Sequence, residues 1–120
     1  MPASTPKSAT SQAERRRRRH PRFRGDFSVT VTILLANQYQ NLEGHCRDLS
    51  EAGIGVLLAA ELNVGEVVDL TFALPGSATW ELRGVLRFRR SYHYGFEFLS
   101  LTVERQQWLK KYLATLKPVD

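Results

Sequence analysis

Residues 27–35 read FSVTVTILL, and their pattern is the clearest indication of the fold class. Apolar and polar side chains alternate without a break from Phe27 to Ile33. Successive side chains of a β-strand point to opposite faces, so strict alternation predicts a strand with one buried and one exposed face. We therefore expect the folded part of the chain to begin with a half-buried strand.

Further short runs follow this first one, and they read as strands at residues 42–49, 54–58, 67–74, 80–89 and 94–98. Turn-forming residues separate them, such as Asn63-Val64-Gly65 and Pro75-Gly76. Six short strands spaced by roughly 8–12 residues predict a mainly β protein, a closed antiparallel barrel or a sandwich. The aromatic residues expected to fill its core are Trp80, Phe88, Phe96 and Phe98.

The periodicity changes after residue 102. Leu109, Tyr112, Leu113 and Leu116 follow the i, i+3, i+4, i+7 spacing of a helix with one apolar face. Thr102 is a suitable N-cap residue for such a helix. One amphipathic helix is therefore predicted over residues 103–116, either covering an opening of the barrel or packing on its outside.

The charge of this 120-residue chain is concentrated in one segment. Residues 15–24 hold seven of the seventeen basic residues, and the rest of the chain has ten basic against twelve acidic residues. A block of like charges is typical of a segment that stays solvated or binds a polyanion. Nucleic acid, an anionic membrane surface and a small phosphorylated ligand all fit that description, and composition does not choose among them.

Three segments are expected along the chain. Residues 1–14 lack apolar periodicity and predict a disordered tail, residues 15–26 an arginine-rich arm, and residues 27–117 the barrel with its helix. Pro21 opposes a helix within the arm. The longest apolar run is far shorter than a membrane span, so a soluble, cytoplasmic protein without a transmembrane segment is expected.

Catalysis has no support in the sequence. It contains none of the common nucleophile, phosphate-binding or zinc-protease motifs. His45 and Cys46 are neighbours on an expected strand and would point to opposite faces, so they cannot act as base and nucleophile. The single cysteine and the widely spaced histidines show no metal-ligand pattern. We expect neither an enzyme nor a metal site.

Two short motifs carry the functional prediction. Arg18 and Arg22 form R-x-x-x-R, and Asp48, Ser50 and Gly53 form D-x-S-x-x-G at the end of an expected strand. An arginine fork binds phosphate oxygens or the O6/N7 edge of guanine. A carboxylate accepts hydrogen bonds from the N–H groups of guanine. Together the motifs indicate a site for a guanine nucleotide with phosphates.

These motifs, in this order around the first strand, resemble those of the PilZ domain, the bacterial receptor for cyclic di-GMP. The run from Tyr94 to Phe98 also resembles a late strand of that family. The resemblance implies a six-stranded barrel of the split-barrel type with a C-terminal helix and no cofactor. It implies cyclic di-GMP as the ligand, and it assigns binding to Arg17, Arg18, Arg22, Asp48, Ser50 and Gly53. Arg17, just before the arginine pair, occupies the position that in the family influences ligand stoichiometry.

Other interpretations stay open at this point. A nucleic-acid-binding small barrel would use the arginine arm on phosphates, although exposed aromatic residues for base stacking are not evident. A scaffold or pilus-assembly protein would bind no nucleotide. Asp48 and Ser50 also fit a simple turn, and Arg87, Arg89 and Arg90 a solvated strand face. The downstream protein partner and the oligomeric state are not indicated by the sequence.

Overall fold

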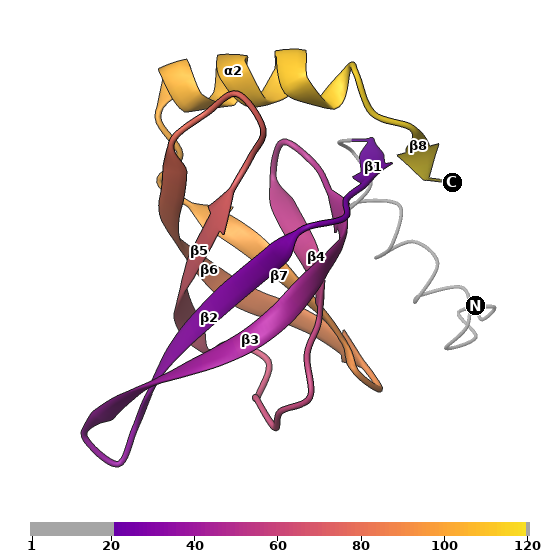
Figure 1. Cartoon of the computed structure of the whole chain (residues 1–120). Helices are drawn as coiled ribbons and strands as arrows, with labels where there is room; N and C mark the ends of the chain where they lie inside the picture. The colour runs from indigo at the N-terminus through magenta and orange to yellow at the C-terminus, as the bar shows by residue number, and fades with distance from the viewer. Residues whose placement is uncertain (1–20, 120) are drawn as a thin grey trace, which may run out of the picture.

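The computed structural model describes residues 21–119, which form a barrel of strands covered at one end by a helix (Figure 1). In chain order the elements are β1 (Arg22–Arg24), β2 (Ser28–Leu35), β3 (Gln38–Leu49), β4 (Gly53–Leu57), β5 (Val67–Ala73), β6 (Thr79–Arg90), β7 (His93–Leu99), α2 (Val103–Leu113) and β8 (Pro118–Val119). Each of the six predicted strands and the predicted helix is present, with its ends shifted by a few residues.

Six of the strands close the barrel. Neighbouring strands run β2-β5-β6-β7-β4-β3, and β3 pairs back to β2. All of these pairings are antiparallel. The predicted six-stranded antiparallel barrel with a C-terminal helix is therefore confirmed.

The two shortest strands lie outside this ring, and the sequence analysis did not predict them. β1 pairs with the last residues of β3 through Phe23↔Leu49 and Arg24↔Asp48. β8 pairs in turn with β1. Arg22–Arg24, which the sequence analysis assigned to the arm, thus lie along the barrel as a strand. Strands of two or three residues are too short to show an alternating pattern.

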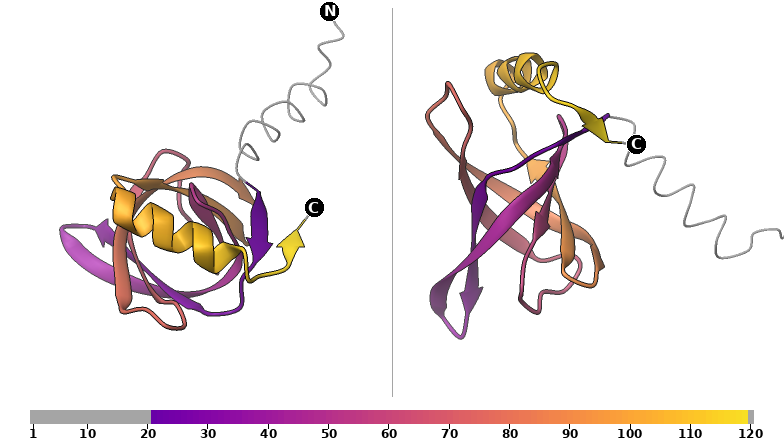
Figure 2. Two further views of the ribbon diagram at one scale, coloured as in Figure 1. Left: turned by 90° about the horizontal axis from the view of Figure 1, so that it is seen from above. Right: turned by 45° about the vertical axis from the view of Figure 1, so that its right-hand side comes forward.

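The core fills the barrel and continues beneath the helix. Val31, Leu70 and Tyr94 are fully buried in the interior. α2 lies across one end of the barrel (Figure 2), where Leu109 and Leu113 are buried. The predicted cap is confirmed, because the Thr102 side chain accepts a hydrogen bond from the Arg105 backbone N–H.

The β2–β3 hairpin projects from the end of the barrel opposite α2 (Figure 1). Its turn consists of Ala36 and Asn37, whose φ values of 51° and 63° lie in the left-handed region. β3 consequently begins at Gln38, which pairs with Leu35. Residues 36–40, which separate the first two predicted strands, are therefore mostly strand. Side chains on both faces of the hairpin are exposed near its tip, so the sequence there shows no alternation of apolar and polar residues.

Two β-bulges reverse the direction of individual side chains. In β3 the bulge lies between Cys46 and Asp48, and in β6 it lies between Leu86 and Phe88. A bulge inserts one extra residue into a strand and re-aims the side chains that follow it. The prediction that Phe88 belongs to the core is wrong, because this residue is only partly buried and pairs with Gly95 on the outer face.

Candidate functional site

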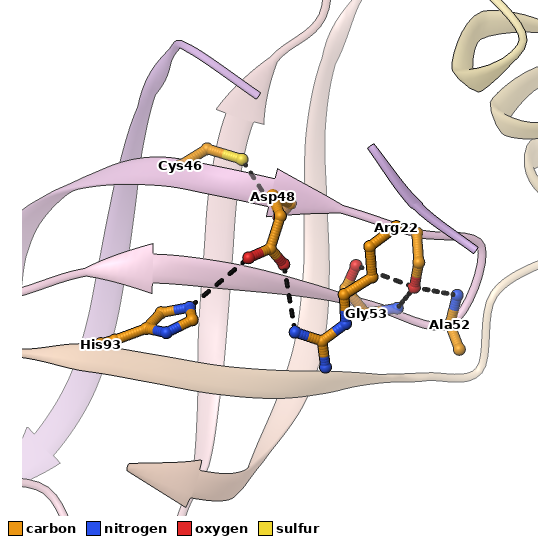
Figure 3. Close-up of polar contacts among 7 residues, drawn as sticks. Arg22, Cys46, Asp48, Ala52, Gly53 and His93 are labelled. Carbon is orange, nitrogen blue, oxygen red and sulfur yellow. Dashed lines mark hydrogen bonds and ion pairs between the residues drawn. The ribbon is translucent and has the colours of Figure 1, made fainter. Parts of the chain in front are cut away.

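Asp48 is the centre of a polar cluster on the outer face of the barrel (Figure 3). Its Oδ1 lies 3.5 Å from Nη1 of Arg22, and its Oδ2 lies 3.5 Å from Nε2 of His93. The three residues come from β3, β1 and β7, so strands distant in sequence build the cluster. The Asp48 side chain is 9% exposed, and the carboxylate is therefore held between two nitrogen groups with little access to water.

The bulge in β3 brings the Asp48 carboxylate to this face. Cys46 pairs with Val56 and points into the core, and simple alternation would send Asp48 the same way. The extra residue, Arg47, instead places Asp48 opposite Gly55. The sequence pattern contained no signal for this reversal.

Gly55 supplies the floor of the cluster. A Cβ atom at this position would lie 2.6 Å from Nε2 of His93 and 2.7 and 2.8 Å from the two carboxylate oxygens of Asp48. These distances are well inside van der Waals contact, so a side chain at Gly55 would push both groups outward. The cluster therefore requires glycine here.

Arg22 is held on its other side by an aromatic ring. Its guanidinium carbon lies 5.5 Å from the ring centroid of Phe88, within the range of a cation–π contact. The Phe88 ring itself lies over Gly95, where a Cβ atom would collide with it. Phe88 and His93 also meet edge to face, with centroids 5.5 Å apart. Arg22 is thus oriented by Asp48 and Phe88 together, and its remaining N–H donors are available for a ligand.

Ser50 and Gly53 shape the turn from β3 to β4. Ser50 Oγ accepts hydrogen bonds from the backbone N–H groups of Ala52 and Gly53, each at 3.1 Å. The Ser50 N–H donates to the Gly53 carbonyl at 2.9 Å. A side chain at Gly53 would collide with the Phe96 carbonyl. Both residues therefore have a structural task in fixing the turn beside Asp48.

Of the six predicted site residues, the structure brings Arg22 and Asp48 into contact and places Ser50 and Gly53 in the adjoining turn. Arg17 and Arg18 lie outside the described residues. Sequence reasoning missed His93, Phe88 and the two glycines beneath them. The pairing of Gly55 with Gly95 across β4 and β7 places both glycines on the outer face. In the sequence, the one indication that other groups lie close to the β4 backbone was the presence of two glycines, Gly53 and Gly55, two residues apart.

Cys46 lies beneath the site and is chemically inert. Its Sγ is buried and donates to the Asp48 carbonyl at 3.3 Å. Burial, and to a lesser degree the charges of Asp48 and Asp26, raise the pKa of this thiol far above its usual value. A thiol that does not ionise cannot act as a nucleophile at neutral pH.

Several arginines outside the cluster are paired with carboxylates. Arg87 contacts Glu97 at 2.6 Å, and Arg89 contacts Glu61 at 2.5 Å. Arg83 lies 3.6 Å from Asp69. These pairs offset much of the positive charge on β6.

Within residues 21–119, no group of histidine, cysteine, aspartate and glutamate side chains is arranged to hold a metal ion. No helix in the same part of the chain is long and apolar enough to cross a membrane.

The sequence profile of the PilZ domain matches residues 16–115. The chain belongs to the PilZ domain family. The recognition made from the two motifs is therefore confirmed, as is the PilZ-like barrel.

Solved structures share this fold. The PilZ domain of YcgR from Escherichia coli with c-di-GMP has a TM-score of 0.65 and 20% identity, over 83% of this chain and 91% of that one. The Bacillus subtilis inhibitor of motility MotI/DgrA has a TM-score of 0.67 and 23% identity, over 82% and 50%. The K. pneumonia MrkH–c-di-GMP complex has a TM-score of 0.63 and 16% identity, over 80% and 50%. The chain thus spans about half the length of MotI/DgrA and MrkH. No curated protein matches its sequence.

Proposed function

We propose that this protein is a non-enzymatic receptor for cyclic di-GMP. One observation carries the proposal: the guanidinium of Arg22 and the carboxylate of Asp48 lie 3.5 Å apart on the outer face of a PilZ barrel. Arginine and aspartate are the two side chains that complement a guanine nucleotide, one for phosphates and base acceptors and the other for base N–H groups. YcgR and MrkH, which share the fold, were solved with c-di-GMP.

Asp48 is proposed to bind guanine. Each carboxylate oxygen offers about two lone-pair positions, so contacts with Arg22 and His93 leave one acceptor position on each oxygen. Guanine presents the N1–H and N2–H groups side by side, and together they match a carboxylate. Adenine presents an acceptor at N1 and would face Asp48 unfavourably. Asp48 therefore accounts for base preference.

Arg22 is proposed to bind the phosphates or the O6/N7 edge of the ligand. Its guanidinium is already oriented by Phe88 and Asp48, so little conformational freedom is lost on binding. The family pattern assigns the same task to Arg18 and a stoichiometry-related position to Arg17, both outside the described residues. Capture of a doubly charged ligand beside β1 would change the surface offered to a protein partner in the cytoplasm.

Isothermal titration with cyclic di-GMP tests the proposal. We expect saturable binding by the full chain and a stoichiometry of one or two ligands per protomer. Cyclic di-AMP should bind far more weakly, and the double variant Arg22→Ala/Asp48→Ala should not bind. Absence of binding by the wild-type chain would refute the function. Equal binding of cyclic di-GMP and single-stranded DNA, with steep salt dependence, would favour a nucleic-acid-binding barrel instead.

A further inference from the structure

His93 carries a polar atom that the fold leaves without a partner. Its Nε2 is buried from solvent and makes no hydrogen bond within the described part of the chain. This nitrogen faces Oδ2 of Asp48 at 3.5 Å, slightly longer than an ordinary N–H···O hydrogen bond. Buried polar atoms are rarely left unpaired, because the loss of water is then uncompensated. An orphaned atom aimed at a functional carboxylate indicates a task in the site.

The surroundings of the imidazole restrict it to that one partner. Gly55 lies beneath it, and the Phe88 ring meets its edge at 5.5 Å between centroids. Across the β7 pairings, β4 places the apolar Leu57 and β6 places Arg90 opposite His93. The charged groups that face the imidazole are therefore Asp48 from β3, Arg22 beyond it from β1, and Arg90 from β6. Asp48 is the acceptor among them.

We infer that His93 is the positioning residue that sets guanine preference in this site, by holding the Asp48 carboxylate in the orientation that accepts both guanine N–H groups. The inference rests on the proposed function. In the proposed complex, Arg22 contacts Oδ1 and His93 Nε2 closes its 3.5 Å separation from Oδ2 to donate to it, so the two contacts oppose rotation of the carboxylate about its Cβ–Cγ bond. Each oxygen then keeps one acceptor position for a guanine N–H group. Without His93, one oxygen loses its anchor and the pair of acceptors is no longer fixed.

The measured quantity is the ratio of the Kd values for cyclic di-AMP and cyclic di-GMP, obtained by titration calorimetry with the full chain. His93→Leu removes the N–H donor and replaces the imidazole with an apolar side chain of moderate size. We expect it to lower this ratio by about tenfold, the effect of losing a hydrogen bond to a charged group. His93→Gln retains an N–H donor on a flexible chain and should recover most of the preference.

The chain offers a matched control at His45. This histidine pairs with Asp26 at 2.7 Å and lies in the same row across β3, β4 and β7, opposite Leu57. His45→Leu makes the same chemical change on the same sheet without touching Asp48, and it should leave the ratio unchanged. Gly55→Ala provides a second route, because a methyl group there displaces both the carboxylate and the imidazole. It should lower the ratio as His93→Leu does, even if His93→Leu folds poorly.

The outcomes separate the two proposals. A wild-type chain that does not bind cyclic di-GMP refutes the receptor function and the role of His93 with it. A wild-type chain with clear guanine preference, retained in both His93→Leu and Gly55→Ala, refutes only the role of His93. Loss of preference in His93→Leu without recovery in His93→Gln also contradicts positioning by a donated hydrogen bond. Loss in His93→Leu with recovery in His93→Gln supports it.

Discussion

Replacing Asp48 by alanine should change stability slightly and base preference strongly. In the free protein the substitution breaks a contact of 3.5 Å with Arg22, whose side chain is 19% exposed and can turn toward water. Because the guanidinium of Arg22 can be solvated after the change, loss of this ion pair should cost about 1 kcal/mol. For a domain of this size, the melting temperature should fall by only about 4–8 °C.

The effect on binding is larger, because the carboxylate accepts two guanine N–H groups in the proposed complex. Losing two charge-assisted hydrogen bonds, less what water replaces, amounts to about 3 kcal/mol, or about 100-fold in the Kd for cyclic di-GMP. Affinity for cyclic di-AMP should stay the same or improve, since the adenine edge no longer faces a carboxylate. Arg22→Ala, in contrast, should weaken both ligands to a similar degree.

The assay is titration of wild type, Asp48→Ala and Arg22→Ala with each cyclic dinucleotide, with thermal melting of each variant as a control for folding. If Asp48→Ala keeps the preference for cyclic di-GMP while remaining folded, Asp48 serves only the turn and the reasoning about guanine is refuted.

Three further predictions concern single residues. Arg22→Lys should bind cyclic di-GMP about tenfold more weakly by calorimetry, because a point charge cannot reproduce a fork that also lies over Phe88; unchanged affinity would contradict this contact. Ser50→Ala should lower the free energy of unfolding by about 1–2 kcal/mol in urea melts, because two backbone donors lose their acceptor; an unaltered midpoint would mean that water replaces the hydroxyl. Cys46 should resist thiol reagents in the native state. Its buried neutral thiol stabilises the fold fully below about pH 9. Above that pH the thiol ionises in the unfolded chain, so this stabilisation decreases as the pH rises further. Stability curves of wild type and Cys46→Ala should therefore converge above that pH, and parallel curves would count against a buried neutral thiol.

The barrel could be predicted from the sequence because apolar and polar residues alternate along half-buried strands. Residues 27–33 alternate without interruption, and all of them except Phe27 lie in β2 within the ring. The helix was equally visible, since Leu109 and Leu113 are spaced for one apolar face and are both buried. Elements without such a pattern were missed: β1 and β8 are too short, and the tip of the β2–β3 hairpin is exposed.

The candidate site was predicted only in part, because its geometry depends on two β-bulges, each of which inserts one residue into a strand. Arg22 and Asp48 were identified from motif spacing and do lie together. The bulges at Arg47 and Arg87, which turn Asp48 and Phe88 outward, arise from pairing between strands and have no local sequence signature. His93 was not identified as a site residue, because its contact with Asp48 appears only when β3, β4 and β7 are aligned.

Binding of cyclic di-GMP on the outer face around Asp48 can be located by a titration followed by ¹H–¹⁵N correlation spectra. We expect the largest changes in amide chemical shift in β1, in the turn joining β3 to β4, and at the start of β7 around His93. Changes concentrated at the tip of the β2–β3 hairpin or along α2, with the amides around Asp48 unaffected, would contradict it.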